Sequence, residues 1–177
     1  MMIAGCALMS VAQVSFAQDQ QPTEYQVKAA YLYNLAKFVE WPEGMFNSPT
    51  APMVFCIMGE DPFGNAFEAA KDRTISNRSI QIKRFASVKD MTPCHVLFIS
   101  RSEKEKLPDI LRELGAAPLL LVGDMEEFAQ RGGMINLALR KETVTLEINI
   151  DALNRAGIKV TSRLLNAAHI VREKKRN

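Results

Sequence analysis

Histidine is scarce in this chain, which contains only His95 and His169. The sequence also lacks H-E-x-x-H, G-x-S-x-G and G-x-x-x-x-G-K-[ST], the motifs of zinc proteases, serine hydrolases and P-loop nucleotide-binding proteins. Cys94 and His95 are adjacent, but neighbouring residues of a strand point to opposite faces, which excludes them as a nucleophile–base pair. We therefore expect no enzyme activity, no metal site and no cofactor.

Cysteine is also rare, with three in 177 residues and no C-x-x-C pair, which argues against a thiol-redox enzyme. Cys6 falls in the apolar N-terminal segment. Cys56 and Cys94 remain, and an even count favours one disulfide in an exported protein. This bond would close a long loop and stabilise the fold by about 4 kcal/mol. The alternative is two buried free thiols, since cysteine packs well as a small hydrophobic residue.

The first seventeen residues contain no charged side chain and end in Ser15-Phe16-Ala17, the small-x-small pattern of a signal-peptidase site. We expect residues 1–17 to be a cleaved signal peptide and residues 18–177 to form one exported domain. A retained membrane anchor is the alternative, but the stretch is shorter than the roughly 20 apolar residues that span a bilayer. A third interpretation is a lipoprotein cleavage box ending at Cys6, which has almost no apolar run before it.

The net charge is only +2, and residues 172–176 alone carry +3, with four basic residues and one acidic residue. Basic residues suit the end of a helix, and the body of the chain is close to neutral. A basic tail can also bind nucleic acid, but export argues against that function. We expect no nucleic-acid partner.

Apolar patterning predicts strands that alternate with helices. A capping box at Thr23 and Gln26 begins a helix that runs to Trp41, with Val27, Tyr31, Leu35 and Phe38 on one stripe. Residues 52–58, 95–100 and 119–122 are short apolar runs typical of buried strands, whereas residues 80–83 alternate as a strand near a sheet edge does. Further helices are predicted from Asp61-Pro62, from Pro108 to Gly115, and from Asp124 with Phe128 inward.

The pattern changes after Gly132-Gly133, which we interpret as a tight entry into an antiparallel hairpin formed by residues 134–139 and 143–149. A short helix at residues 151–156 and a last helix from Thr161 or Ser162 to Val171 complete the chain. The predicted fold is a single-domain α/β sandwich, with a mostly parallel sheet and an antiparallel hairpin at its C-terminal end.

Polar residues near the hairpin are the candidate site. Glu147 and Asn149 share one face of the second hairpin strand, and Arg163 begins the last helix. One interpretation is a solvated sheet face. The other is a recognition site, or a polar group that holds the first helix through Asn34 and Lys37. Trp41 is the only tryptophan, and a large aromatic residue can either pack in the core or anchor an interface.

Residues 28–42, KAAYLYNLAKFVEWP, resemble the opening helix of the YfiR-like family. Four later segments resemble the family in the same order, and the likeness extends from about Tyr25 to Val171: residues 56–64, residues 94–100, residues 132–135, and residues 147–149 with 162–165. Cys56 and Cys94 occupy family cysteine positions, so the resemblance implies that they form the family's structural disulfide. A second cysteine pair found in some members is missing after Cys94.

The resemblance implies a dimeric periplasmic regulator that inhibits an inner-membrane diguanylate cyclase by binding the cyclase's periplasmic domain. An outer-membrane lipoprotein would relieve the inhibition by sequestering the regulator. Low cyclase activity keeps cyclic-di-GMP and biofilm formation low.

The alternative is a periplasmic small-molecule-binding module acting on another membrane sensor, with Trp41, Glu147, Asn149 and Arg163 lining a crevice at the strand carboxyl ends. A hydrolase using Ser162 and His169 is disfavoured, because two turns of the predicted helix, roughly 10 Å, would separate them.

Overall fold

The computed structural model describes residues 22–173, so the predicted leader at residues 1–17 and the end of the basic tail lie outside the described residues. Eight strands form one sheet in the order β10-β8-β7-β6-β5-β2-β4-β3, and β1 pairs with β9 in a second, two-stranded sheet. Within the large sheet, β7–β8 and β3–β4 are antiparallel and the other neighbouring pairs are parallel. The strand bounds are β1 Val39–Glu40, β2 Met53–Met58, β3 Thr74–Ile75, β4 Arg78–Phe85, β5 Val96–Ile99, β6 Leu120–Gly123, β7 Ile135–Arg140, β8 Thr143–Asn149, β9 Lys159–Val160 and β10 His169–Val171.

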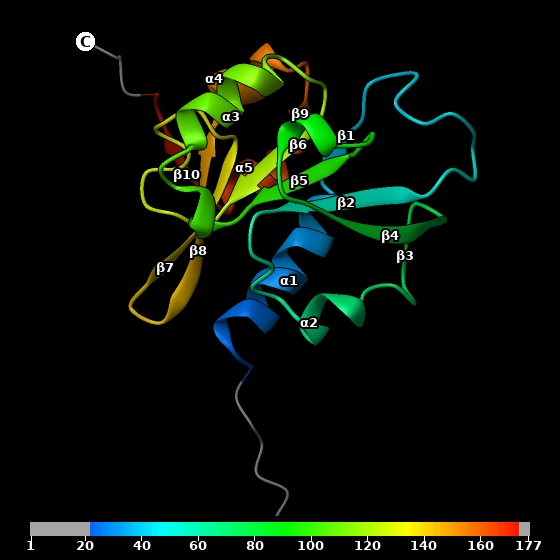
Figure 1. Ribbon diagram of the computed structural model, residues 1–177, viewed down its shortest axis with the longest axis horizontal. Coiled ribbons are helices and arrows are strands. Elements are labelled where there is room, and N and C mark those ends of the chain that lie inside the picture. Colours follow the sequence, from blue (N-terminus) through cyan, green and yellow to red (C-terminus); the bar gives the residue numbers. More distant parts are fainter. Residues whose placement is uncertain (1–21, 174–177) are drawn as a thin grey trace, which may run out of the picture.

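Helices cover both faces of the sheet, with α1 and α2 on one side and α3 and α4 on the other (Figure 1). The helix bounds are α1 Glu24–Leu35, α2 Asn65–Glu68, α3 Leu107–Leu114, α4 Ile150–Arg155 and α5 Ser162–Asn166. Every residue of β2, β5 and β6 is buried, as expected for parallel strands covered on both faces. The predicted α/β sandwich is confirmed. Among residues 22–173, no helix has both the length and the apolar character needed to cross a bilayer.

The first helix begins as predicted but ends earlier. Thr23 and Gln26 form the expected capping box, and α1 stops at Leu35 rather than continuing to Trp41. The chain then turns so that Val39 can pair with Val160 of β9, which a prediction from local periodicity could not include. The predicted apolar stripe is confirmed in part: Leu35 is buried, and Val27, Tyr31 and Phe38 pack against the core while partly exposed. The buried residues of α1 also include four that the stripe did not contain: Lys28, Ala29, Leu32 and Tyr33.

Asp61 does not cap a helix, because α2 begins only at Asn65, after Gly64. One carboxylate oxygen of Asp61 instead accepts the Phe63 backbone N–H at 2.8 Å, and the other accepts Arg84 Nε at 2.7 Å. Asp61 therefore stabilises a turn and forms an ion pair with Arg84, rather than capping a helix.

Two other predicted helices are corrected by the structure. The segment after Asp124 forms consecutive turns rather than a helix, although Phe128 is fully buried as expected. The last helix ends at Asn166, and His169–Val171 form β10, which pairs in parallel with β8. Ser162 and His169 therefore lie on different elements. The apolar residues of this last segment also fit helical spacing, but residues 169–171 form backbone pairs with the open edge of β8 instead.

The hairpin and the disulfide are confirmed. Lys141 and Glu142 connect β7 to β8 with φ of 47° and 64°, as in the tight turns that suit the twist of a hairpin. Gly132 has φ of +109°, and a Cβ added to Gly133 would lie 2.2 Å from the Phe128 ring, so both glycines are required at the hairpin entry. Cys56 on β2 is bonded to Cys94, just before β5, with their Cα atoms 6.1 Å apart.

Candidate functional site

The candidate site lies beyond the carboxyl ends of β5 and β6. Arg101 follows β5 after Ser100, and Asp124 follows β6 directly. The antiparallel hairpin adds Asn136 on β7, paired in register with Gly123, and Glu147 on β8, opposite Asn136. In open α/β sheets this edge is the common place for ligand binding, because the loops that leave the strands converge there.

A buried ionic cluster joins α1 to this edge. Asp124 Oδ2 accepts hydrogen bonds from Lys28 Nζ at 2.9 Å, Arg101 at 2.8 Å and the Tyr25 hydroxyl at 2.9 Å. Glu24 also pairs with Lys28 and, at 3.0 Å, with Arg101. The side chains of Lys28 and Asp124 are both 0 % exposed, so this pair is shielded from water. The cluster fixes the N-terminal half of α1 against the sheet.

These contacts determine the ionisation of the cluster. Burial by itself would raise the pKa of Asp124, but bonds from Lys28 and Arg101 outweigh it and hold the pKa below its ordinary value of 3.8. Burial and the Asp124 charge raise the pKa of Tyr25, so its hydroxyl stays a donor. The stabilisation from Asp124 is complete above pH 3.8 and is lost as the pH falls through the depressed pKa of the folded protein.

Glu147 has its own donors. Its side chain is 4 % exposed; it accepts Asn136 Nδ2 at 3.0 Å and also pairs with Arg140. Burial alone would raise the pKa of Glu147, but these bonds and the Arg140 charge hold it below its ordinary value of 4.5. The interpretation of a solvated sheet face is wrong, because Asn136 and Glu147 are 2 % and 3 % exposed.

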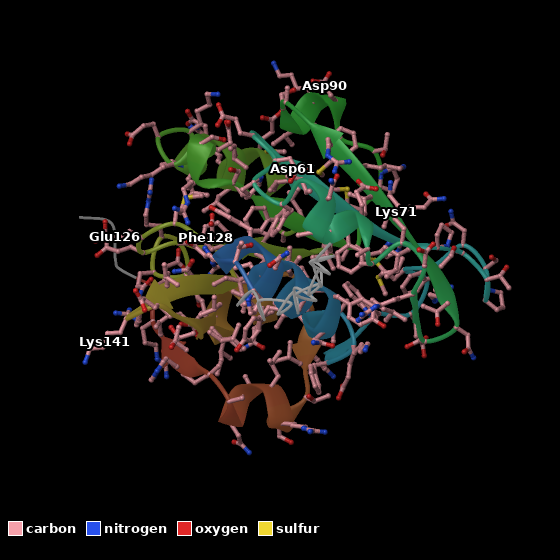
Figure 2. The ribbon with its side chains drawn as sticks, turned by 90° about the horizontal axis from the view of Figure 1, so that it is seen from below. Asp61, Lys71, Asp90, Glu126, Phe128 and Lys141 are labelled. Atoms are coloured by element: carbon pink, nitrogen blue, oxygen red, sulfur yellow. A yellow bond between two sulfur atoms is a disulfide. The ribbon has the colours of Figure 1, made fainter. Side chains whose placement is uncertain are left out.

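Both clusters border one pocket of about 620 Å³. Its wall includes Arg101 and Asp124 from the first cluster, Asn136 and Glu147 from the second, and Gln130 from the loop between β6 and β7. This volume is in the range of small-molecule sites. Figure 2 shows Glu126, at the pocket rim, and Lys141, at the hairpin turn, on the same side of the molecule.

The four residues expected at a site fall into two groups. Glu147 lines the pocket, whereas Asn149 is 0 % exposed and caps α4, with its Oδ1 accepting Ala152 N–H at 3.0 Å and its Nδ2 donating to Ala129 O at 2.7 Å. Trp41 and Arg163 both flank the β1–β9 sheet. Neither Trp41 nor Arg163 lines the pocket, so Glu147 is the only one of the four expected residues that does.

Around the β1–β9 sheet the contacts are mainly aromatic. The Trp41 indole N–H donates to Ala36 O at 3.3 Å, and its ring packs edge-on against Phe46 and His95. The guanidinium of Arg163, on the surface, lies 5.9 Å from the centre of the Phe38 ring. Asn34 and Lys37 were expected to hold α1, but they bond to each other at 3.4 Å. The hydrogen bond between Lys28 and Asp124 connects α1 to the sheet instead.

His95 gives this region a pH dependence. His95 Nδ1 accepts the Val54 backbone N–H at 2.9 Å, and burial is the main cause that lowers the His95 pKa below 6.5, with the Arg78 charge acting in the same direction. Between pH 6.5 and the lower pKa of the folded state, the unfolded chain binds more protons. We expect the free energy of unfolding to fall on acidification through this range, by at most about 1.4 kcal/mol per pH unit.

Urea denaturation between pH about 7 and 5 measures this slope. His95→Phe should flatten this slope, and His169→Phe, at an exposed position on β10, is the control for the loss of a histidine. A slope that persists in His95→Phe would assign the pH dependence to other groups.

Lys28, Arg101 and Asp124 were not identified from the sequence as site residues. Two signals pointed to them: Glu24 and Lys28 have the i,i+4 spacing of a helical ion pair, and charged residues follow two wholly apolar strands. Among residues 22–173, no group of three or more His, Cys, Asp or Glu side chains could hold a metal ion.

Comparison with protein families gives a match that covers most of the chain. Residues 25–169 match the family described as YfiR/HmsC-like. The matched region extends from the first turn of α1 to the start of β10, and so includes the pocket, the disulfide and every residue of the two clusters except Glu24.

Proposed function

The chain belongs to the YfiR/HmsC-like family, and from this membership we propose that it inhibits an inner-membrane diguanylate cyclase by binding the cyclase's periplasmic domain. The family itself indicates a periplasmic, non-catalytic regulator in cyclic-di-GMP signalling. Inhibition lowers cyclic-di-GMP and with it biofilm formation. The observation that carries the proposal is the extent of the match, which spans the fold from α1 to β10.

Inhibition by binding requires a difference in affinity between two states of the cyclase. The regulator must bind the inactive form of the periplasmic domain more tightly than the active form, and it shifts the population by that difference. We place the contact at Trp41 and Arg163, because Glu147 and Asn149 are too deeply buried to meet a protein surface. The partly exposed indole and the exposed guanidinium are of the kinds that anchor protein interfaces. The regulator acts as a homodimer. An outer-membrane lipoprotein sequesters the regulator and thereby releases the cyclase from inhibition.

Affinity capture tests this proposal. The tagged chain from residue 18 is incubated with detergent-solubilised membranes of its host, and bound proteins are identified by mass spectrometry. We expect recovery of a diguanylate cyclase with a periplasmic domain, with or without a lipoprotein. Recovery of a different membrane sensor, or of no membrane protein, would contradict it.

A matched pair of charge reversals tests the contact surface. Arg163→Glu should reduce cyclase recovery about tenfold, because reversing an interface charge both removes an attraction and adds a repulsion. Arg112→Glu is the control, since Arg112 is also exposed but lies on α3, where its ion-pair partner is Asp109. Equal losses in the two variants would place the contact elsewhere.

A further inference from the structure

Three buried side-chain oxygens at the pocket have no hydrogen-bond partner within residues 22–173: Asp124 Oδ1, Gln130 Oε1 and Asn136 Oδ1. All three residues line the same pocket, and Asp124 and Asn136 are 8 % and 2 % exposed. Buried polar atoms are nearly always paired in folded proteins, so a group of three on one cavity wall indicates an absent donor.

The three atoms specify what that donor is. Each is an acceptor, whereas the donors nearby are already engaged: Asn136 Nδ2 with Glu147, and Arg101 and Lys28 with Asp124. The missing partner must therefore carry N–H or O–H groups. A second lone-pair acceptor, such as a phosphate or carboxylate oxygen, would leave all three oxygens unsatisfied.

The charges at the pocket favour a cationic donor. The wall carries three basic and four acidic residues, a net charge of −1. The side chains of Arg101 and Arg140 are 52 % and 62 % exposed, so water screens them, whereas the Asp124 and Glu147 side chains are 0 % and 4 % exposed. Lys28 and Arg101 both bond to Asp124 through Oδ2, which leaves Oδ1 of this ionised carboxylate without a partner at the pocket. A cationic donor would form a charge-assisted hydrogen bond to Oδ1, and such bonds are stronger than those between neutral groups.

We infer that this pocket binds a small organic molecule through an ammonium group, which donates to Asp124 Oδ1, Asn136 Oδ1 and Gln130 Oε1. A primary ammonium has three N–H donors, one for each unpaired oxygen. The pocket, at about 620 Å³, leaves room for the rest of the ligand beyond this group. The inference is independent of the cyclase proposal, because binding is a property of the isolated chain.

Ethanolamine and choline are the matched probes. Both are small cationic alcohols, but the nitrogen of choline carries three methyl groups and has no N–H. Each is titrated, up to about 10 mM and at constant ionic strength, into the ¹⁵N-labelled chain from residue 18, and amide and side-chain resonances are followed by NMR. We expect saturable shifts at Asn136 and Gln130 with ethanolamine and none with choline. Equal shifts with choline, the same shifts with NaCl, or no saturable shifts with ethanolamine would overturn the inference.

Two variants assign the binding to the unpaired oxygens. Asp124→Asn should weaken ethanolamine binding about tenfold, since it removes a charged acceptor. Because Asp124 also supports the fold, Gln130→Met is the second variant; it removes one acceptor at a partly exposed position and should weaken binding about threefold. Gln81→Met, at an exposed position on β4, is the control. Unchanged affinity in Gln130→Met and in folded Asp124→Asn would overturn the assignment.

Discussion

We expect the Cys56→Ala/Cys94→Ala variant to unfold with about 4 kcal/mol less free energy than the wild-type chain. The disulfide closes a sequence separation of 38 residues, and the loss of loop entropy in the unfolded chain gives this magnitude. The bond joins β2 to the start of β5, at the centre of the sheet order. Both cysteines are buried, so the bond links core segments rather than surface loops.

Urea denaturation of the chain from residue 18, with and without dithiothreitol, measures this contribution. When dithiothreitol reduces the bond, the free energy of unfolding of the wild-type chain should fall most of the way to that of the alanine variant. The alanine variant itself should show no effect of the reductant. The variant thereby controls for any other action of dithiothreitol. Equal stability of the wild-type chain in both conditions would mean that the bond adds nothing to the fold.

Much of the fold could be predicted from local sequence signals. The wholly apolar runs that became β5 and β6 require cover on both faces, which indicates a parallel sheet between helices. Pro108 and Gly115 mark the two ends of α3, and the alternation of residues 135–139 and 143–148 indicates a hairpin. In each case the cause lies within a few residues of the effect.

The errors arise where a distant partner decides the outcome. Val39 and Glu40 leave the helical conformation because β9 offers backbone partners, and His169–Val171 form a strand because β8 has an open edge. The buried face of α1 was predicted only in part, because the apolar stripe at helical spacing did not include Lys28. Lys28 is buried through a contact with Asp124, 96 residues later, which periodicity cannot show.

The candidate site was predicted only in part for the same reason. Glu147 was identified, but a strand's alternation cannot show whether its polar face is covered. The 124–131 loop provides that cover with Gln130 and the rim of the pocket, and its path depends on Phe128 packing against Gly123 and Gly133. The unpaired oxygens exist only because loop, hairpin and strand end meet there.

Lys28→Met should lower the free energy of unfolding by about 3 kcal/mol. The substitution keeps a similar volume but removes the fully buried ammonium group that bonds to Asp124, whose side chain is 0 % exposed. Arg101 and Tyr25 still donate to the carboxylate, which holds the loss to the lower end of the range for a broken buried ion pair. Urea denaturation at neutral pH measures the change.

Lys71→Met is the surface control for that measurement. Lys71 pairs with Glu68 at 47 % and 34 % side-chain exposure, and its loss should cost less than about 1 kcal/mol. The double variant Lys28→Met/Asp124→Asn should be more stable than Lys28→Met alone, because the cost comes from leaving a buried carboxylate under-compensated and the amide removes that charge. If the two substitutions instead destabilise additively, Lys28 acts through packing of its alkyl chain, and the ion pair does not hold α1 to the sheet.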